Sequence, residues 1–101
     1  QLGTAKELNF SGLAWCDEEL AVLAQTLAAE ALSKLEKLGL YGNRIGDAGC
    51  IALVKACAGG TLPNLAALDL CDNSIGDAGC TALGKACAAG TLPNLEYLDL
   101  R

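Results

Sequence analysis

Apolar residues, mainly leucines, recur along this chain, and their spacing alternates between the period of a β-strand and that of an α-helix. Leu35, Leu38 and Leu40 end in strict alternation, which predicts a short β-strand with one buried face. From Cys50 to Cys57 the apolar residues lie three or four positions apart, which predicts a helix over about 48–58. One strand followed by one helix is therefore the expected structural unit.

This unit is repeated. Residues 35–64 and 65–94 align without a gap and share 21 identities in 30 positions. A further copy begins at 95–101, and a divergent copy occupies about 5–34, where Trp15 stands at the position of Ile45. We expect one domain over 1–101, and because the last copy is partial, a segment of a longer array.

Each helix has a candidate start and stop. Asp17, Asp47 and Asp77 stand at equivalent positions just before the apolar helical pattern, and each is expected to cap its own helix. The first helix is expected to be longer, over 17–32. Gly59-Gly60 should end the second helix in a left-handed conformation, and Pro63 should prevent it from resuming.

The segments LxxLxLxxNxI at 35–45 and 65–75 resemble the leucine-rich repeat. The IGDAG turn and full helix that follow are similar to the ribonuclease-inhibitor-like, intracellular subclass. The resemblance implies an α/β solenoid, a right-handed horseshoe segment with parallel strands inside and helices outside. The period of 30 is slightly long, and Leu13 replaces the expected Asn, so the first copy is interpreted as a cap or a degenerate terminal repeat.

Spacing predicts the curvature of such a stack. Parallel strands pair about 4.8 Å apart, whereas helices pack about 8–10 Å apart, so the strands should line a concave face. Asn43 and Asn73 are expected to be structural, because a buried amide must hydrogen-bond and can satisfy backbone groups in the turn.

Composition and charge exclude several classes of protein. The chain is 52% apolar with a net charge of −5, so we do not expect disorder. Its seven basic residues are scattered singly, which argues against nucleic-acid binding. The longest uncharged stretch, 56–68, is too short for a membrane span, and no signal-peptide pattern opens the sequence.

The six cysteines follow the repeat. Cys50 and Cys80 are 30 positions apart, as are Cys57 and Cys87, so each pair is expected to lie on neighbouring helices. Helices pack about 8–10 Å apart, whereas a disulfide needs Cα atoms within about 7 Å, so neither pair is expected to form one. Without CxxC spacing or histidine, no metal site is expected. We expect buried, reduced thiols and a reducing intracellular compartment, either the cytoplasm or an organellar interior. Cys71 is expected to be the one reachable thiol.

No catalytic constellation is evident. The absence of histidine excludes Ser-His and Cys-His pairs, and helix capping explains Asp47 and Asp77. The Gly59-Gly60 and GDAG segments lack the Lys and Ser/Thr of a phosphate-binding loop. We therefore expect no enzyme activity and no cofactor.

The concave face remains as a candidate partner site, by resemblance to how such repeats bind proteins. Side chains that flank the strand leucines should point to it. The expected partner-binding residues are Glu7, Asn9, Lys37, Tyr41, Asp69, Cys71, Tyr97, Asp99 and Arg101.

Three functional hypotheses follow. The first is a non-catalytic module that binds a protein partner of unknown identity. The second is a structural subunit docked permanently in a large assembly, since the strand that ends at Arg101 leaves one end of the stack to be covered by further repeats or by another protein. The third is a regulatory array of the sensor or GTPase-activating type, although such arrays are usually longer.

Overall fold

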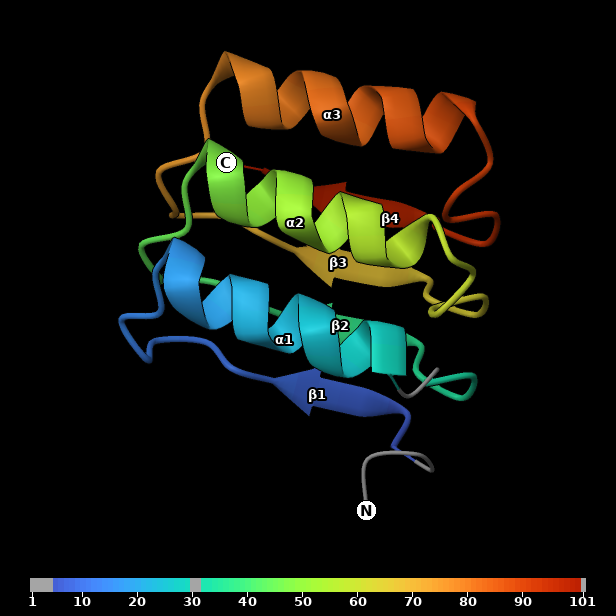
Figure 1. Cartoon of the computed structure of the whole chain (residues 1–101). Helices are drawn as coiled ribbons and strands as arrows, with labels where there is room; N and C mark the ends of the chain where they lie inside the picture. Colours follow the sequence, from blue (N-terminus) through green and yellow to red (C-terminus); the bar gives the residue numbers. More distant parts are fainter. Residues whose placement is uncertain (1–4, 30–31, 101) are drawn as a thin grey trace.

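The computed structural model describes residues 5–29 and 32–100. Strands and helices alternate along the chain as β1 (Glu7–Asn9), α1 (Asp17–Ala29), β2 (Lys37–Gly39), α2 (Asp47–Cys57), β3 (Ala67–Asp69), α3 (Asp77–Ala88) and β4 (Tyr97–Asp99). The four strands form one parallel sheet in the order β1-β2-β3-β4, and the helices form a layer on one side of it (Figure 1). The fold is the expected α/β repeat solenoid.

Strand register follows the repeat. Leu8, Leu38, Leu68 and Leu98 lie directly opposite one another across the sheet. The ladder continues one residue past β1, β2 and β3, as in the bond from Leu40 N to Asp69 O at 2.8 Å. Every unit therefore presents the same positions to its neighbours, 30 residues apart.

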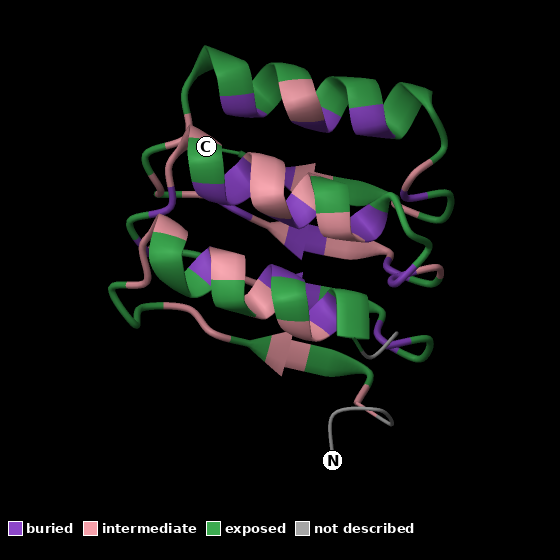
Figure 2. Cartoon of the chain, in the orientation of Figure 1, coloured by how far each residue is buried: buried purple, intermediate pink, exposed green. Residues whose placement is uncertain are grey.

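The core lies between the sheet and the helices. It consists mainly of the strand leucines and the inner helical stripe, and around β2 and β3 and on α2 these side chains are almost fully buried. Leu8 and Phe10 at β1, Ile75 in the turn before α3, and Leu98 in β4 are only partly buried. Figure 2 shows the same gradient, with buried positions gathered on the inner faces. Each unit thus depends on a neighbour to complete its core.

The glycine stop is confirmed at Gly60, whose φ is +76°, and Gly90 has the same φ at the end of α3. Gly60 N donates to Cys57 O at 2.9 Å, which closes the last turn of α2. The structure describes α1 to Ala29, whereas we expected the first helix to reach residue 32; residues 30 and 31 lie outside the described part.

The expectation that each aspartate caps its own helix is wrong. The residue that flanks α2 is Gly46, which makes no side-chain cap bond, and the same holds for Gly76 at α3. Instead, Asp17 Oδ1 accepts from Gly46 N at 2.8 Å and Gly49 N at 2.9 Å, both at the start of the next helix. Asp47 Oδ1 binds Gly76 N and Gly79 N in the same way, at 2.7 and 2.9 Å. The capping bond therefore joins two repeats.

The expected burial of the thiols is correct for α2 but wrong for α3. Cys50 and Cys57 are 0% and 2% exposed, because α2 lies between α1 and α3. Cys80 and Cys87 occupy the same positions on α3 and are exposed, while Cys71 is half-buried. Cys71 is therefore not the one reachable thiol. All six cysteines are free.

Candidate protein-binding face

The side of the sheet opposite the helices carries two rows of side chains, which we call the concave face. One row is Glu7, Lys37, Ala67 and Tyr97, and the other is Asn9, Gly39, Asp69 and Asp99. They reach this face because each flanks a leucine that points into the core, and successive strand residues alternate between faces. The local alternation of the sequence therefore positions the whole surface.

The face is hollowed across all four strands. A depression of about 390 Å³ is lined by Glu7, Leu8, Asn9, Lys37, Leu38, Gly39, Ala67, Asp69 and Tyr97. Its middle is low because Gly39 and Ala67 contribute little side chain. Across the strands, Lys37 and Tyr97 stand on either side of Ala67, whereas Asn9 and Asp69 stand on either side of Gly39.

Two tyrosines project from this side of the molecule. Tyr97 is 55% exposed at the β4 end of the depression, and Tyr41, which follows β2, is 48% exposed. The backbone beneath Tyr41 is held by a bond from its N–H to Ser11 Oγ at 3.1 Å. Exposed tyrosines on a rigid backbone bury much apolar surface at low entropic cost when a partner binds.

Charged groups on the face are of both signs. Lys37 Nζ lies 3.5 Å from Glu7 Oε1, and both side chains are about two-thirds exposed. Such an ion pair adds little to stability, since solvent screens it. Both side chains therefore remain available to polar groups of a partner.

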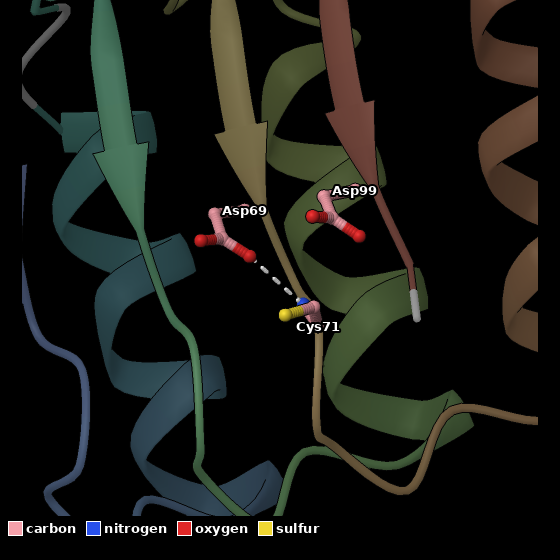
Figure 3. A group of neighbouring side chains, drawn as sticks. All are labelled: Asp69, Cys71 and Asp99. Carbon is pink, nitrogen blue, oxygen red and sulfur yellow. Dashed lines mark hydrogen bonds between the residues drawn. The ribbon is translucent and has the colours of Figure 1, made fainter.

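Asp69, Cys71 and Asp99 converge at one end of the face (Figure 3). Asp69 Oδ1 accepts from Cys71 N at 3.0 Å, and Asp99 Oδ2 accepts from the Tyr97 hydroxyl at 3.2 Å. Asp99 is only 8% exposed, so it presents little of its own surface to a partner, and its bond to the Tyr97 hydroxyl restrains that side chain. Of the described members of the expected partner-binding set, Asp99 is the one that the structure buries.

These three residues also bring one carboxylate oxygen each and the thiol sulfur within 4.8 Å of one another. They are thus a group among the described residues that could supply ligands to a metal ion. A structural zinc site needs four protein ligands, and here two of the side chains also make the hydrogen bonds given above. The absence of a metal site stays a prediction.

The predicted partner-binding residues are therefore brought together in part. Glu7, Asn9, Lys37, Asp69 and Tyr97 line the depression. Tyr41 and Cys71 follow the strands at its edge, and Arg101 lies outside the described residues.

The two asparagines hold the turns behind this face. Asn43 Oδ1 accepts from Leu13 N and Trp15 N, and its Nδ2 donates to Phe10 O and Leu40 O, all at 3.0 Å. Asn73 accepts from Ile45 N and donates to Leu40 O at 2.8 Å. Each amide therefore links the turn of its own repeat to the turn of the preceding one.

A family model described as "Leucine Rich repeat" matches residues 31–54 and again 61–84. The chain is a leucine-rich-repeat protein. The two matched segments each cover a strand, its turn and most of the following helix, which agrees with the observed units. A comparison with curated proteins finds no match.

Two further properties of this leucine-rich-repeat protein bear on its function. Within the described ranges, each helix is too short or too polar to cross a membrane. Repeats of this family commonly mediate protein–protein interaction and typically act as non-catalytic modules. The ribonuclease-inhibitor-like subclass stays a prediction.

Proposed function

We propose that the concave face binds a protein partner and that the chain acts as a non-catalytic interaction module. The observation that carries this proposal is the pair of exposed tyrosines, Tyr41 and Tyr97, beside a depression with small residues at its centre. Tyrosine is among the residues that dominate binding energy at protein interfaces. A protruding side chain of the partner would enter the space above Ala67, between Lys37 and Tyr97.

The chemistry of the chain supports binding over catalysis. The sequence contains no histidine. The Asp17 and Asp47 carboxylates are occupied by helix N-termini, and Asp99 accepts from Tyr97. These three carboxylates therefore take part in structural hydrogen bonds.

We also propose that the protein resides in a reducing intracellular compartment. Six free thiols, two of them exposed on α3, support this location, because oxidising compartments convert exposed thiols to disulfides.

A second candidate function is that of a structural subunit held in a larger assembly. The exposed Cys80 and Cys87 favour it, since the equivalent Cys50 and Cys57 are buried beside a neighbouring helix. Expression of this chain alone distinguishes the two functions. A soluble monomer supports the module, whereas recovery only together with another protein supports the subunit.

The binding proposal is tested by affinity purification with matched variants. Tyr41→Ala together with Tyr97→Ala should weaken the recovered complex by at least about thirtyfold, since hot-spot truncations cost about 2 kcal/mol or more. The control pair Lys55→Ala and Lys85→Ala removes two exposed side chains from the helical side. If the control pair abolishes binding while the tyrosine pair leaves it unchanged, the concave face is not the site.

A further inference from the structure

Helix α1 has a second hollowed surface, on the side away from α2. Ala21, Ala24 and Gln25 line the groove that α1 shares with α2. On another side, Trp15, Glu18, Glu19, Val22, Leu23 and Thr26 line a depression of about 410 Å³, which we call the α1 end face. Its helical part runs from Glu18 to Thr26, about two and a half turns of α1.

The α1 end face is apolar at its centre. Val22 is 62% exposed, although it lies on a helix whose inner stripe buries Leu20 and Leu27. Trp15 and Leu23 are half-buried, and the Trp15 ring stacks on Phe10 with centroids 4.7 Å apart. Two stacked aromatic rings beside an exposed valine form an apolar patch, which is typical of a surface that another protein covers.

A preceding repeat of the same type would be the simplest cover, but it could not make the aspartate bond that joins the other repeats. At the third position of α2 and α3, Gly49 and Gly79 donate to the aspartate of the repeat before. A Cβ at Gly49 would lie 2.6 Å from Asp17 Oδ1, and one at Gly79 would lie 2.8 Å from Asp47 Oδ1. Only glycine allows that approach, and α1 has Glu19 at this position.

Glu19 also makes the hydrogen bond that the aspartate of a preceding repeat would make. Its Oε1 accepts from Cys16 N at 2.8 Å, the position equivalent to Gly46 N and Gly76 N. This bond is the main reason that the pKa of Glu19 lies below its ordinary value. A second carboxylate at the same helix start would meet both the Glu19 side chain and its charge.

The charge of the surface indicates what does fit. α1 carries Asp17, Glu18 and Glu19 in its first turn and no lysine or arginine along its length. Because Asp17 binds α2 and Glu19 binds Cys16, Glu18 is the exposed carboxylate that makes no structural bond of this kind. A complementary occupant must be apolar along one stripe and basic beside it.

We infer that the α1 end face docks an amphipathic basic helix of a partner protein. The helix would pack beside α1 as α2 does on the other side, with leucine-sized residues between Trp15, Val22 and Leu23 and a lysine or arginine opposite Glu18. This surface is separate from the concave face, so either can function without the other.

Trp15 provides the readout, because it is the single tryptophan of the chain and lines the depression. The probe is an acetylated 14-residue amphipathic peptide of leucine and lysine, and its control is the same pattern with glutamate in place of lysine. The leucine–lysine peptide should produce a saturable change in Trp15 emission, whereas the leucine–glutamate peptide should not.

Variants of the full chain locate the site. Glu18→Lys and Val22→Asn should each weaken the leucine–lysine peptide by at least about tenfold, as expected for central interface contacts. Glu36→Lys makes the same charge change at an exposed residue just before β2 and should leave the affinity within about twofold. Equal losses in Glu18→Lys and Glu36→Lys would indicate non-specific attraction and overturn the inference.

Two other outcomes would also overturn it. If Trp15 emission does not change when the leucine–lysine peptide is added, the peptide does not occupy the depression. An emission shift that depends on protein concentration alone would show that a second copy of this chain covers the α1 end face.

Discussion

Asn43 is the side chain on which the turns of the first two repeats depend. Its amide makes four hydrogen bonds to backbone groups, and it is buried. Removing the hydrogen-bond partner of a buried backbone group costs about 1–3 kcal/mol, because neither water nor another protein group replaces that partner.

Asn43→Ala should therefore lower the free energy of unfolding by more than about 3 kcal/mol, as measured by urea denaturation. Asn64→Ala is the matched control, since Asn64 is exposed and donates one bond, to Ser33 O at 2.6 Å. It should cost less than about 1 kcal/mol. Equal losses in the two variants would contradict the structural role of Asn43.

The thiols of α2 and α3 should differ in reactivity. Burial raises the pKa of Cys57 to about 11, and burial, with smaller contributions from Cys80 and Asp47, raises that of Cys50 to about 11. Only the thiolate reacts quickly, so a thiol reagent at pH 8 should label Cys80 and Cys87 first. Mass spectrometry of the labelled peptides measures this order, and early labelling of Cys57 would contradict it.

The same pKa shifts predict a loss of stability at high pH. Between about pH 9 and 11 the unfolded chain releases these two protons while the folded chain retains them, so the free energy of unfolding falls as pH rises. Denaturation at pH 8 and pH 10.5 should show this fall. Replacing both residues with alanine should remove this contribution to the pH dependence.

At the scale of the elements, the bond between repeats at the starts of α2 and α3 is the main new feature. Asp47 and Asp77 occupy the same place on α2 and α3, but Asp47 also holds the start of α3. Among residues 5–29 and 32–100, no helix follows α3, so Asp77 has no next helix start to bind. The pair therefore isolates the contribution of the inter-repeat bond.

Asp47→Ala should reduce stability by about 1–2 kcal/mol, as loss of a cap does, whereas Asp77→Ala should change it by less than about 0.5 kcal/mol. Thermal denaturation of both variants measures the difference. Equal effects would mean that each aspartate acts on its own helix, as we expected from the sequence.

The elements themselves could be predicted from the sequence because strand and helix periods alternate so regularly. The expected helix over about 48–58 is α2 at Asp47–Cys57, and the strand leucines define the core and therefore the opposite face. The role of Asp17 and Asp47 could not be predicted, because the capping rule is local and their partners lie 29 and 32 positions away.

Two other features depend on neighbours that no local pattern reveals. Cys80 and Cys87 repeat the spacing of Cys50 and Cys57, yet their exposure depends on what packs against α3. The burial of Asp99 depends on contacts made once the strands are side by side. The α1 end face did have a signal in the sequence, because Val22 is a large apolar residue that lies off the inner stripe of its helix.

At the scale of the whole molecule, the stack has two distinct surfaces. The concave face presents Tyr41 and Tyr97 around a depression, and the α1 end face presents Trp15 and Val22 beside acidic residues. The helix-start chemistry at Glu19 makes the α1 end face unlike the junctions between repeats. We propose the concave face as the surface that binds a protein partner.

Site-specific photo-crosslinking shows directly whether a protein partner binds the concave face. A photoreactive phenylalanine analogue would replace Tyr97 on the concave face or, as control, Lys85 on the outer side of α3. We expect a partner crosslink from position 97 and none from position 85. A crosslink from position 85 with none from position 97 would contradict it.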